Sequence, residues 1–190
     1  MQRKEVAEYA FTDFWSFKPK WTHPFFRLVS HLIVPLSVCV FNNAHTVPVY
    51  HDARLITTFR ESVALLQQNT RLIIFPEKNQ RFNNVLYAFQ DKFVDVARFY
   101  YKKTGQALPF VPLYIAPKLK TMYLGTPIVF DPSAPIDEER LRICRESAEQ
   151  ITQLAASLPE HTVIPYRNIP KKDYPKNKPI EVYQNEENAC

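Results

Sequence analysis

Apolar residues recur along three stretches of the chain at the three-residue and four-residue steps of an amphipathic helix. In segment 57–68 they share one face, and in segment 84–103 they continue until Gly105, a residue type that commonly ends helices. The third stretch, 136–158, begins after Pro135 and carries one apolar stripe flanked by charged residues. The pattern therefore predicts three helices.

Apolar runs between these stretches predict strands. Residues 72–75 form an uninterrupted apolar run between Arg71 and Pro76, which is typical of a strand buried on both faces near the centre of a sheet. Helices that alternate with strands indicate an α/β fold with a mixed, mostly parallel sheet flanked by helices, because parallel strands need helical crossovers. Shorter strands are predicted at 46–50, 110–116, 121–124 and 128–130.

The most apolar tract of the chain, 24–41, is interrupted by Arg27, His31 and Pro35. It therefore falls short of the roughly 20 clean apolar residues that a membrane-spanning helix needs. We expect instead a buried or interfacial helix, which Pro35 breaks and a strand follows.

Composition narrows the class of protein. The 190 residues, 46% of them apolar, suit one compact domain at 1–158, followed by a proline-rich basic arm with an acidic tip at 159–190. Only two glycines occur, which excludes the glycine-rich loops that cradle nucleotide phosphates. The three cysteines show neither zinc nor disulfide spacing and fit a reducing cytoplasm, and the histidines lack the spacing of a metal site. A net charge of +5 favours anionic partners.

Polar and charged residues follow the predicted central strand at once. Ligands in α/β sheets usually bind at the carboxyl ends of strands, and here Glu77, Lys78 and Arg81 occupy that position. A carboxylate beside two cationic side chains can bind the polar head of a phosphorylated alcohol, although a solvent-exposed turn would contain the same residue types.

The order of these features resembles the glycerolphosphate and lysophosphatidate acyltransferase family. The resemblance rests on an apolar strand, the sequence Phe-Pro-Glu at 75–77, a long helix that ends in glycine, and the sequence Val-Pro-Leu at 111–113. Members of that family transfer an acyl chain from an acyl thioester to the hydroxyl of a glycerol phosphate or lysophospholipid at a membrane surface. The resemblance covers roughly residues 8–130. It implies an acyltransferase-like fold without a bound cofactor, with acyl-CoA or acyl carrier protein as the co-substrate.

The resemblance also assigns residues to the acceptor. Glu77 stands at the glutamate of the family's Phe-Pro-Glu-Gly block and would bind the acceptor, whereas Lys78 departs from that pattern and Arg81 lies one place beyond the family's arginine. In the block that supplies a phosphate-binding arginine, His51 occupies the expected position and Arg54 is the nearest substitute. We therefore expect these basic residues to meet the acceptor phosphate.

The catalytic block of the family, His-x-x-x-x-Asp, is matched only in part. Asp13 matches the aspartate that orients the base, but Glu8 stands at the histidine position. Glutamate has an unperturbed pKa of ~4.3 against ~6.5 for histidine, so it is a weak base for a hydroxyl unless burial raises its pKa. Three explanations stay open: the chain begins downstream of the true catalytic block, His51 or His23 supplies the base, or the protein no longer catalyses.

The expected partners are an acyl thioester donor, a lysophospholipid or glycerol phosphate acceptor, and the inner face of a membrane, to which a cytoplasmic protein would bind peripherally. An aromatic cluster beside Lys18 and Lys20 suits the boundary between headgroups and acyl chains. One alternative is a catalytically inactive lipid-binding or regulatory relative. Another is a basic nucleic-acid-binding domain, because lysines and tyrosines interleave in segment 166–178. No recognised nucleic-acid motif accompanies that segment, so the sequence favours lipid over nucleic acid.

Overall fold

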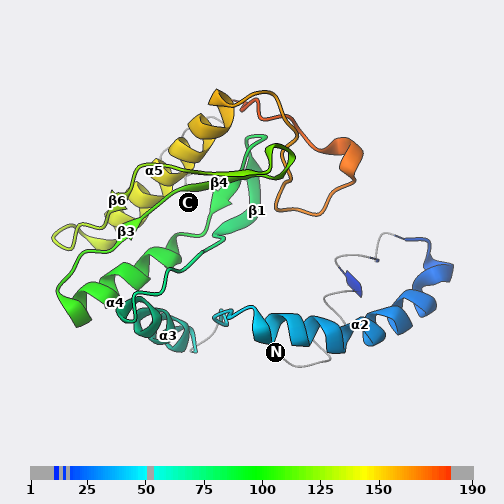
Figure 1. The fold of residues 1–190 in the computed structure, drawn as a ribbon, viewed down its shortest axis with the longest axis horizontal. Coiled ribbons are helices and arrows are strands. Elements are labelled where there is room, and N and C mark those ends of the chain that lie inside the picture. The colour runs from blue at the N-terminus through cyan, green and yellow to red at the C-terminus, as the bar shows by residue number, and fades with distance from the viewer. Residues whose placement is uncertain (1–10, 13–14, 16–17, 51–53, 181–190) are drawn as a thin grey trace. The chain divides into compact units, whose positions relative to one another are not determined.

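The computed structural model describes residues 11–12, 15, 18–50 and 54–180 (Figure 1). The chain divides into two compact units, Met1–Val49 and Tyr50–Cys190. Glu8, Asp13 and His51 lie outside the described residues. In the first unit the short 3-10 helix η1 (Lys20–Thr22) leads into the helix α2 (His23–Asn43).

Helix α2 runs without interruption through Pro35, so the predicted break at this residue is wrong. A proline inside a helix removes a single backbone hydrogen bond and crowds the preceding turn, and the helical bonds on either side keep the rest of this helix intact. The segment after α2, 46–50, is not a strand, contrary to the prediction. Among the described residues α2 is the one helix whose length and composition are those of a membrane-spanning segment, with a mean hydropathy of 1.4 over its most apolar window.

The helices of the second unit are α3 (Leu55–Gln67), α4 (Asp95–Thr104) and α5 (Ile136–Ser157). They confirm the predicted helices at 57–68 and 136–158 and the second half of that at 84–103. Gly105 ends α4 in the left-handed conformation, with φ 72°, as expected of a glycine at a helix C-terminus.

The first half of the segment 84–103 forms the second strand of a β-hairpin and a short 3-10 helix, η2 (Asp91–Val94), instead of helix. Strand β1 (Glu77–Phe82) pairs with β2 (Tyr87–Phe89) in antiparallel fashion. At the turn, the side-chain oxygen of Asn83 accepts the backbone N–H groups of Val85 and Leu86 at 3.0 and 2.9 Å, and Asn84 has φ 72°. This local hydrogen bonding competes with helix formation and ends the helical pattern.

All strand pairs among the described residues are antiparallel and two-stranded, so the predicted mostly parallel sheet is wrong. Besides the hairpin, β3 (Pro109–Phe110) pairs with β6 (Ile128–Val129), and β4 (Leu113–Ala116) pairs with β5 (Thr121–Leu124). The last pair is joined through the 3-10 helix η3 (Pro117–Leu119), whose short connection permits only an antiparallel neighbour.

The apolar run 72–75 is not a buried central strand. It is extended, and the side chains of Ile73 and Phe75 are 68% and 71% exposed. The turn at 83–84 sets the hairpin register so that Glu77 pairs with Phe89 and Phe82 with Tyr87, with an irregularity between these pairs, and Pro76 has no N–H to extend the ladder into the apolar run. An apolar run therefore lies in the solvent beside the predicted site.

The core of the second unit lies between α5 and the strands (Figure 1). Cys144 and Ala155 of α5 pack with Phe89, Tyr114 and Ala116. A second cluster joins α5 and α4 through Ile143, Val94 and Ala97, together with Ile128 and Phe130.

Residues 159–180, which include the 3-10 helix η4 (Lys171–Asp173), return to the end of α5. Asn177 is 3% exposed, and its amide donates to the carbonyl of Ala155 at 2.7 Å while its oxygen accepts the N–H of His161 at 2.8 Å. The Nε2 atom of His161 lies 2.7 Å from the hydroxyl of Tyr114. The described part of the basic arm is therefore tied into the core.

Candidate functional site

Glu77 begins strand β1 directly after the exposed apolar run. Its side chain is half-buried, and its Oε2 atom accepts the backbone N–H of Tyr87 at 2.8 Å. Burial raises the pKa of this carboxyl group above its usual value, an effect that the hydrogen bond from Tyr87 partly offsets. A carboxylate with a raised pKa is a stronger hydrogen-bond acceptor, which suits contact with a hydroxyl group.

The structure places Lys78 and Arg81 on the same strand as Glu77. Lys78 is half-buried and Arg81 is exposed. A carboxylate and two cations within the five residues 77–81 are groups of the kinds that bind a hydroxyl and a phosphate.

Arg54 occupies a different place in the second unit. It precedes α3, and its guanidinium group lies 4.4 Å from the ring centre of Tyr50. Helix α3 packs on α4, where Phe59 and Phe99 stack with ring centres 5.3 Å apart. Of the four predicted acceptor residues that the structure describes, Glu77, Lys78 and Arg81 therefore lie on β1, whereas Arg54 precedes α3.

The hairpin that carries the site is held firmly at its turn. The side-chain amide of Asn83 donates to the hydroxyl of Thr152 on α5 at 3.0 Å, and the amide of Asn84 donates to the carbonyl of Lys178 at 3.2 Å. The rings of Phe82 and Tyr87 stack with centres 4.4 Å apart. The turn-prone Asn83-Asn84 pair is the sequence feature that could have located this support.

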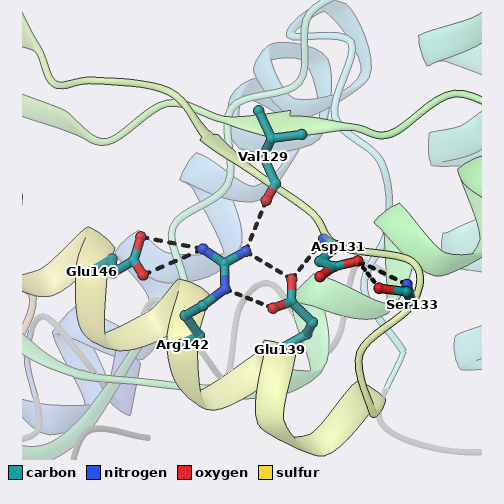
Figure 2. A network of polar contacts seen from close by, with 6 residues as sticks. All are labelled: Val129, Asp131, Ser133, Glu139, Arg142 and Glu146. Atoms are coloured by element: carbon teal, nitrogen blue, oxygen red, sulfur yellow. Dashed lines mark hydrogen bonds and ion pairs between the residues drawn. The ribbon is translucent and has the colours of Figure 1, made fainter.

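Figure 2 shows a second polar network, in which Arg142 of α5 lies between two carboxylates. Its Nε atom lies 2.6 Å from Glu139, its Nη1 atom 3.3 Å from Glu146, and its Nη2 atom donates to the carbonyl of Val129 at 2.8 Å. Glu139, which is 2% exposed, also accepts the N–H of Asp131 at 2.8 Å. The network joins α5 to the end of β6.

A shallow pocket of about 660 Å³ lies beside this network. Three carboxylates and two guanidinium groups line it, and the Arg142 guanidinium is already paired. This balance of charge does not favour an anionic headgroup.

The Glu139 network makes a prediction about pH. The hydrogen bond from Arg142 lowers the pKa of Glu139 despite its burial. The pKa of Glu139 is therefore lower in the folded protein than in the unfolded chain. The stabilisation that its charged form provides is complete above the unfolded pKa and is lost as the pH falls through the folded pKa. We expect Glu139→Gln to lower the free energy of unfolding by about 2 kcal/mol at pH 7. We also expect the free energy of unfolding of this variant to fall less steeply as the pH is lowered. Urea unfolding at pH values on both sides of the carboxyl range measures both effects, and an unchanged acid slope would contradict this account.

The basic arm offers less free charge than its sequence indicates. The ammonium groups of Lys176 and Lys178 lie 3.5 and 2.9 Å from the carboxylate of Glu160. Tyr166 contacts the ring of Tyr87 edge-on, and Tyr174 is half-buried. The lysines and tyrosines proposed for phosphates and bases are thus partly engaged within the chain.

No group of three or more histidine, cysteine, aspartate or glutamate side chains that could hold a metal ion occurs among the residues described by the structure. Comparison with protein-family models, with curated proteins and with solved structures found no match for this chain.

Proposed function

We propose that the chain is a peripheral membrane protein of phospholipid metabolism that transfers an acyl chain from acyl-CoA or acyl carrier protein to the hydroxyl of a lysophospholipid or glycerol phosphate. The observation that carries the membrane part of this proposal is the exposed stripe of α2. The acyl-transfer part is supported by the order of the sequence blocks and by the chemistry of Glu77 and its neighbours.

The exposed stripe of α2 consists of five large apolar residues that are between 56% and 71% exposed and recur at steps of three and four: Phe25, Leu28, Leu32, Leu36 and Val40. Trp21 of η1, which is 83% exposed, precedes them. Such spacing aligns the five residues on one face of the helix. The opposite face packs within its own unit, where Val34 and Ser30 are buried and Phe26 stacks on Trp15. A soluble protein rarely leaves so continuous an apolar face in water, so we infer that lipid covers it.

Cationic residues accompany this stripe. Lys18 and Lys20 precede α2, and Arg27 lies within its first half and is exposed. Lysine and arginine near a membrane surface are attracted to anionic headgroups, while the apolar face enters the acyl region. Arg27, His31 and Pro35 favour a helix that lies in the interface over one that crosses the bilayer.

In the proposed reaction, Glu77 accepts a hydrogen bond from the acceptor, and Lys78 and Arg81 neutralise its phosphate. A general base removes the proton from the acceptor hydroxyl, the oxygen attacks the thioester carbonyl, and the carbon–sulfur bond breaks so that the thiol leaves with the proton. The sequence candidates for that base are Glu8, with Asp13 to orient it, and the histidines His51 and His23. Arg54 remains a candidate phosphate ligand that would have to act from α3.

A second candidate function is a lipid-binding or regulatory relative that does not catalyse. The observation that favours it is the glutamate, Glu8, at the position where the family has its catalytic histidine. This candidate keeps the lipid-covered α2 and acceptor binding at Glu77, but it predicts no thioester cleavage.

The test is release of thiol from long-chain acyl-CoA, with and without lysophosphatidate, on anionic vesicles. We expect acceptor-dependent release, and Glu77→Gln should raise the KM for the acceptor by about tenfold, because a charge-assisted hydrogen bond becomes a neutral one. Glutamine can still accept the N–H of Tyr87, so the hairpin should persist.

Glu61→Gln is the matched control, since it removes an exposed carboxylate from α3. It should leave the KM unchanged. An unchanged KM in Glu77→Gln would contradict the assigned role of Glu77, and absence of thiol release from the wild-type chain while it binds vesicles would favour the second candidate.

A further inference from the structure

The β4–β5 ribbon exposes a second apolar surface, which has no role in the site described above. Its outward face consists of the directly opposed pairs Leu113 with Leu124 and Ile115 with Met122. Met122 and Leu124 are 67% and 68% exposed, and Ile115 is 40% exposed.

The other face of the same ribbon forms part of the core. Tyr114 and Ala116 alternate with the outward residues, are 5% and 0% exposed, and belong to the cluster that contains Cys144 and Ala155 of α5. The ribbon is therefore apolar on both faces, although a ribbon that faces water on one side usually alternates apolar with polar residues. We therefore expect an apolar partner to cover the outward face.

The charged residues near the outward face indicate which kind of partner covers it. Segment 109–130 contains no aspartate or glutamate, and its two charged residues, Lys118 and Lys120, are both exposed at the connection between β4 and β5. Apolar side chains next to lysines match a bilayer with anionic headgroups, because the lysine ammonium groups reach the phosphates while the apolar groups enter the acyl region.

A second copy of the chain fits this face less well. A stable protein interface covers about 800 Å² on each partner and involves about 20 to 30 residues a side. The outward face offers four apolar side chains. Shallow insertion into lipid requires no such area.

We infer that the outward face of the β4–β5 ribbon is a membrane contact for anionic phospholipid, separate from the stripe of α2. The inference rests on the proposed action at a membrane surface and adds the surface through which the second unit meets the lipid. It also predicts that the ribbon, and not α2 alone, responds to headgroup charge.

The test uses the full-length chain with its native cysteines replaced and a polarity-sensitive fluorophore on Met122→Cys. Vesicles contain equal parts of phosphatidylcholine and phosphatidylglycerol. We expect the emission to shift to shorter wavelength on binding and to be quenched by lipids that carry a nitroxide in the acyl chain. The same label on Gln153→Cys, an exposed position of α5, should show neither effect.

Charge variants provide the second measurement. Neutralising both lysines, in Lys118→Gln/Lys120→Gln, should weaken vesicle binding by about twenty-fivefold, because each lysine near an anionic surface contributes about fivefold. Lys102→Gln/Lys103→Gln, which removes two exposed lysines from α4, is the matched control and should have a much smaller effect.

The outcomes separate this inference from the proposed function. Vesicle binding with the Met122 label still in water would overturn the inference and leave the proposed function standing. Failure of the chain to bind vesicles would overturn both. A blue shift that appears without vesicles and grows with protein concentration would show that a second copy covers the face, and would also overturn the inference.

Discussion

Replacing Leu28, Leu32 and Leu36 of α2 by serine is expected to weaken binding of the chain to anionic vesicles by a hundredfold or more. These leucines are 60%, 71% and 66% exposed, so they are free to enter lipid. Complete burial of one such side chain contributes about 1.5–3 kcal/mol, and three together exceed the roughly 2.7 kcal/mol that corresponds to a hundredfold change. Vesicle flotation over a range of lipid concentrations measures the effect.

The matched control replaces three exposed isoleucines of the second unit, in Ile56→Ser/Ile164→Ser/Ile180→Ser. It also removes three exposed apolar side chains, which are 46%, 50% and 55% exposed, and should retain nearly all vesicle binding. Equal loss in both variants would mean that binding follows general hydrophobicity and not the α2 stripe. We also expect alkaline carbonate to extract the chain from membranes, because α2 is proposed to lie in the interface. Resistance of the chain to this extraction would indicate that α2 spans the bilayer.

Arg140→Ala is expected to lower the free energy of unfolding by about 3–5 kcal/mol. One guanidinium nitrogen, Nη2, lies 2.7 Å from both carboxylate oxygens of Asp95, and Nε donates to the same carboxylate at 3.2 Å. Asp95 is 7% exposed at the start of α4, so removing Arg140 leaves a buried carboxylate without its main partner. Chemical unfolding monitored by circular dichroism measures the loss.

Arg145→Ala tests the specificity of this effect, because Arg145 is an exposed arginine on the same helix. It should change the free energy of unfolding by less than about 0.5 kcal/mol. The double variant Arg140→Ala/Asp95→Asn should recover part of the stability, since it removes the unpaired charge. A loss below about 1 kcal/mol in Arg140→Ala would show that the ion pair does not hold α4 to α5.

The helices were predictable because their apolar residues follow a period that persists over many turns. Helix α5 illustrates this, with buried Ile143, Cys144 and Ala155 on one stripe. The hairpin β1–β2 was missed because the helical pattern from 84 onward begins inside the Asn83-Asn84 turn. The side-chain oxygen of Asn83 accepts the N–H groups of the residues two and three positions later. Local turn chemistry outweighed the longer period there.

The sheet type was not predictable from the same pattern. An apolar run such as 72–75 looks alike whether it lies in a sheet or in solvent, and periodicity carries no information about which strands pair. The short connections at 83–86 and 117–120 decide the pairing, and both give antiparallel neighbours.

The location of the candidate residues was not predictable, because Glu77 begins strand β1 instead of following the carboxyl end of a buried central strand, and its role stays a prediction. Glu77, Lys78 and Arg81 lie on one strand, as their nearness in sequence requires, and the burial of Glu77 adds a raised pKa that composition could not provide. The ion pair of Asp95 with Arg140 joins residues 45 positions apart, which is why no sequence spacing revealed it.

The most direct test of the central claim, acyl transfer to a lysophospholipid at a membrane surface, is product analysis. The full-length chain is incubated with anionic vesicles that contain lysophosphatidate and with isotopically labelled long-chain acyl-CoA. The account predicts label in newly formed phosphatidate, in an amount that falls when the α2 leucines or Glu77 are replaced. Vesicle binding without any labelled phosphatidate would contradict acyl transfer.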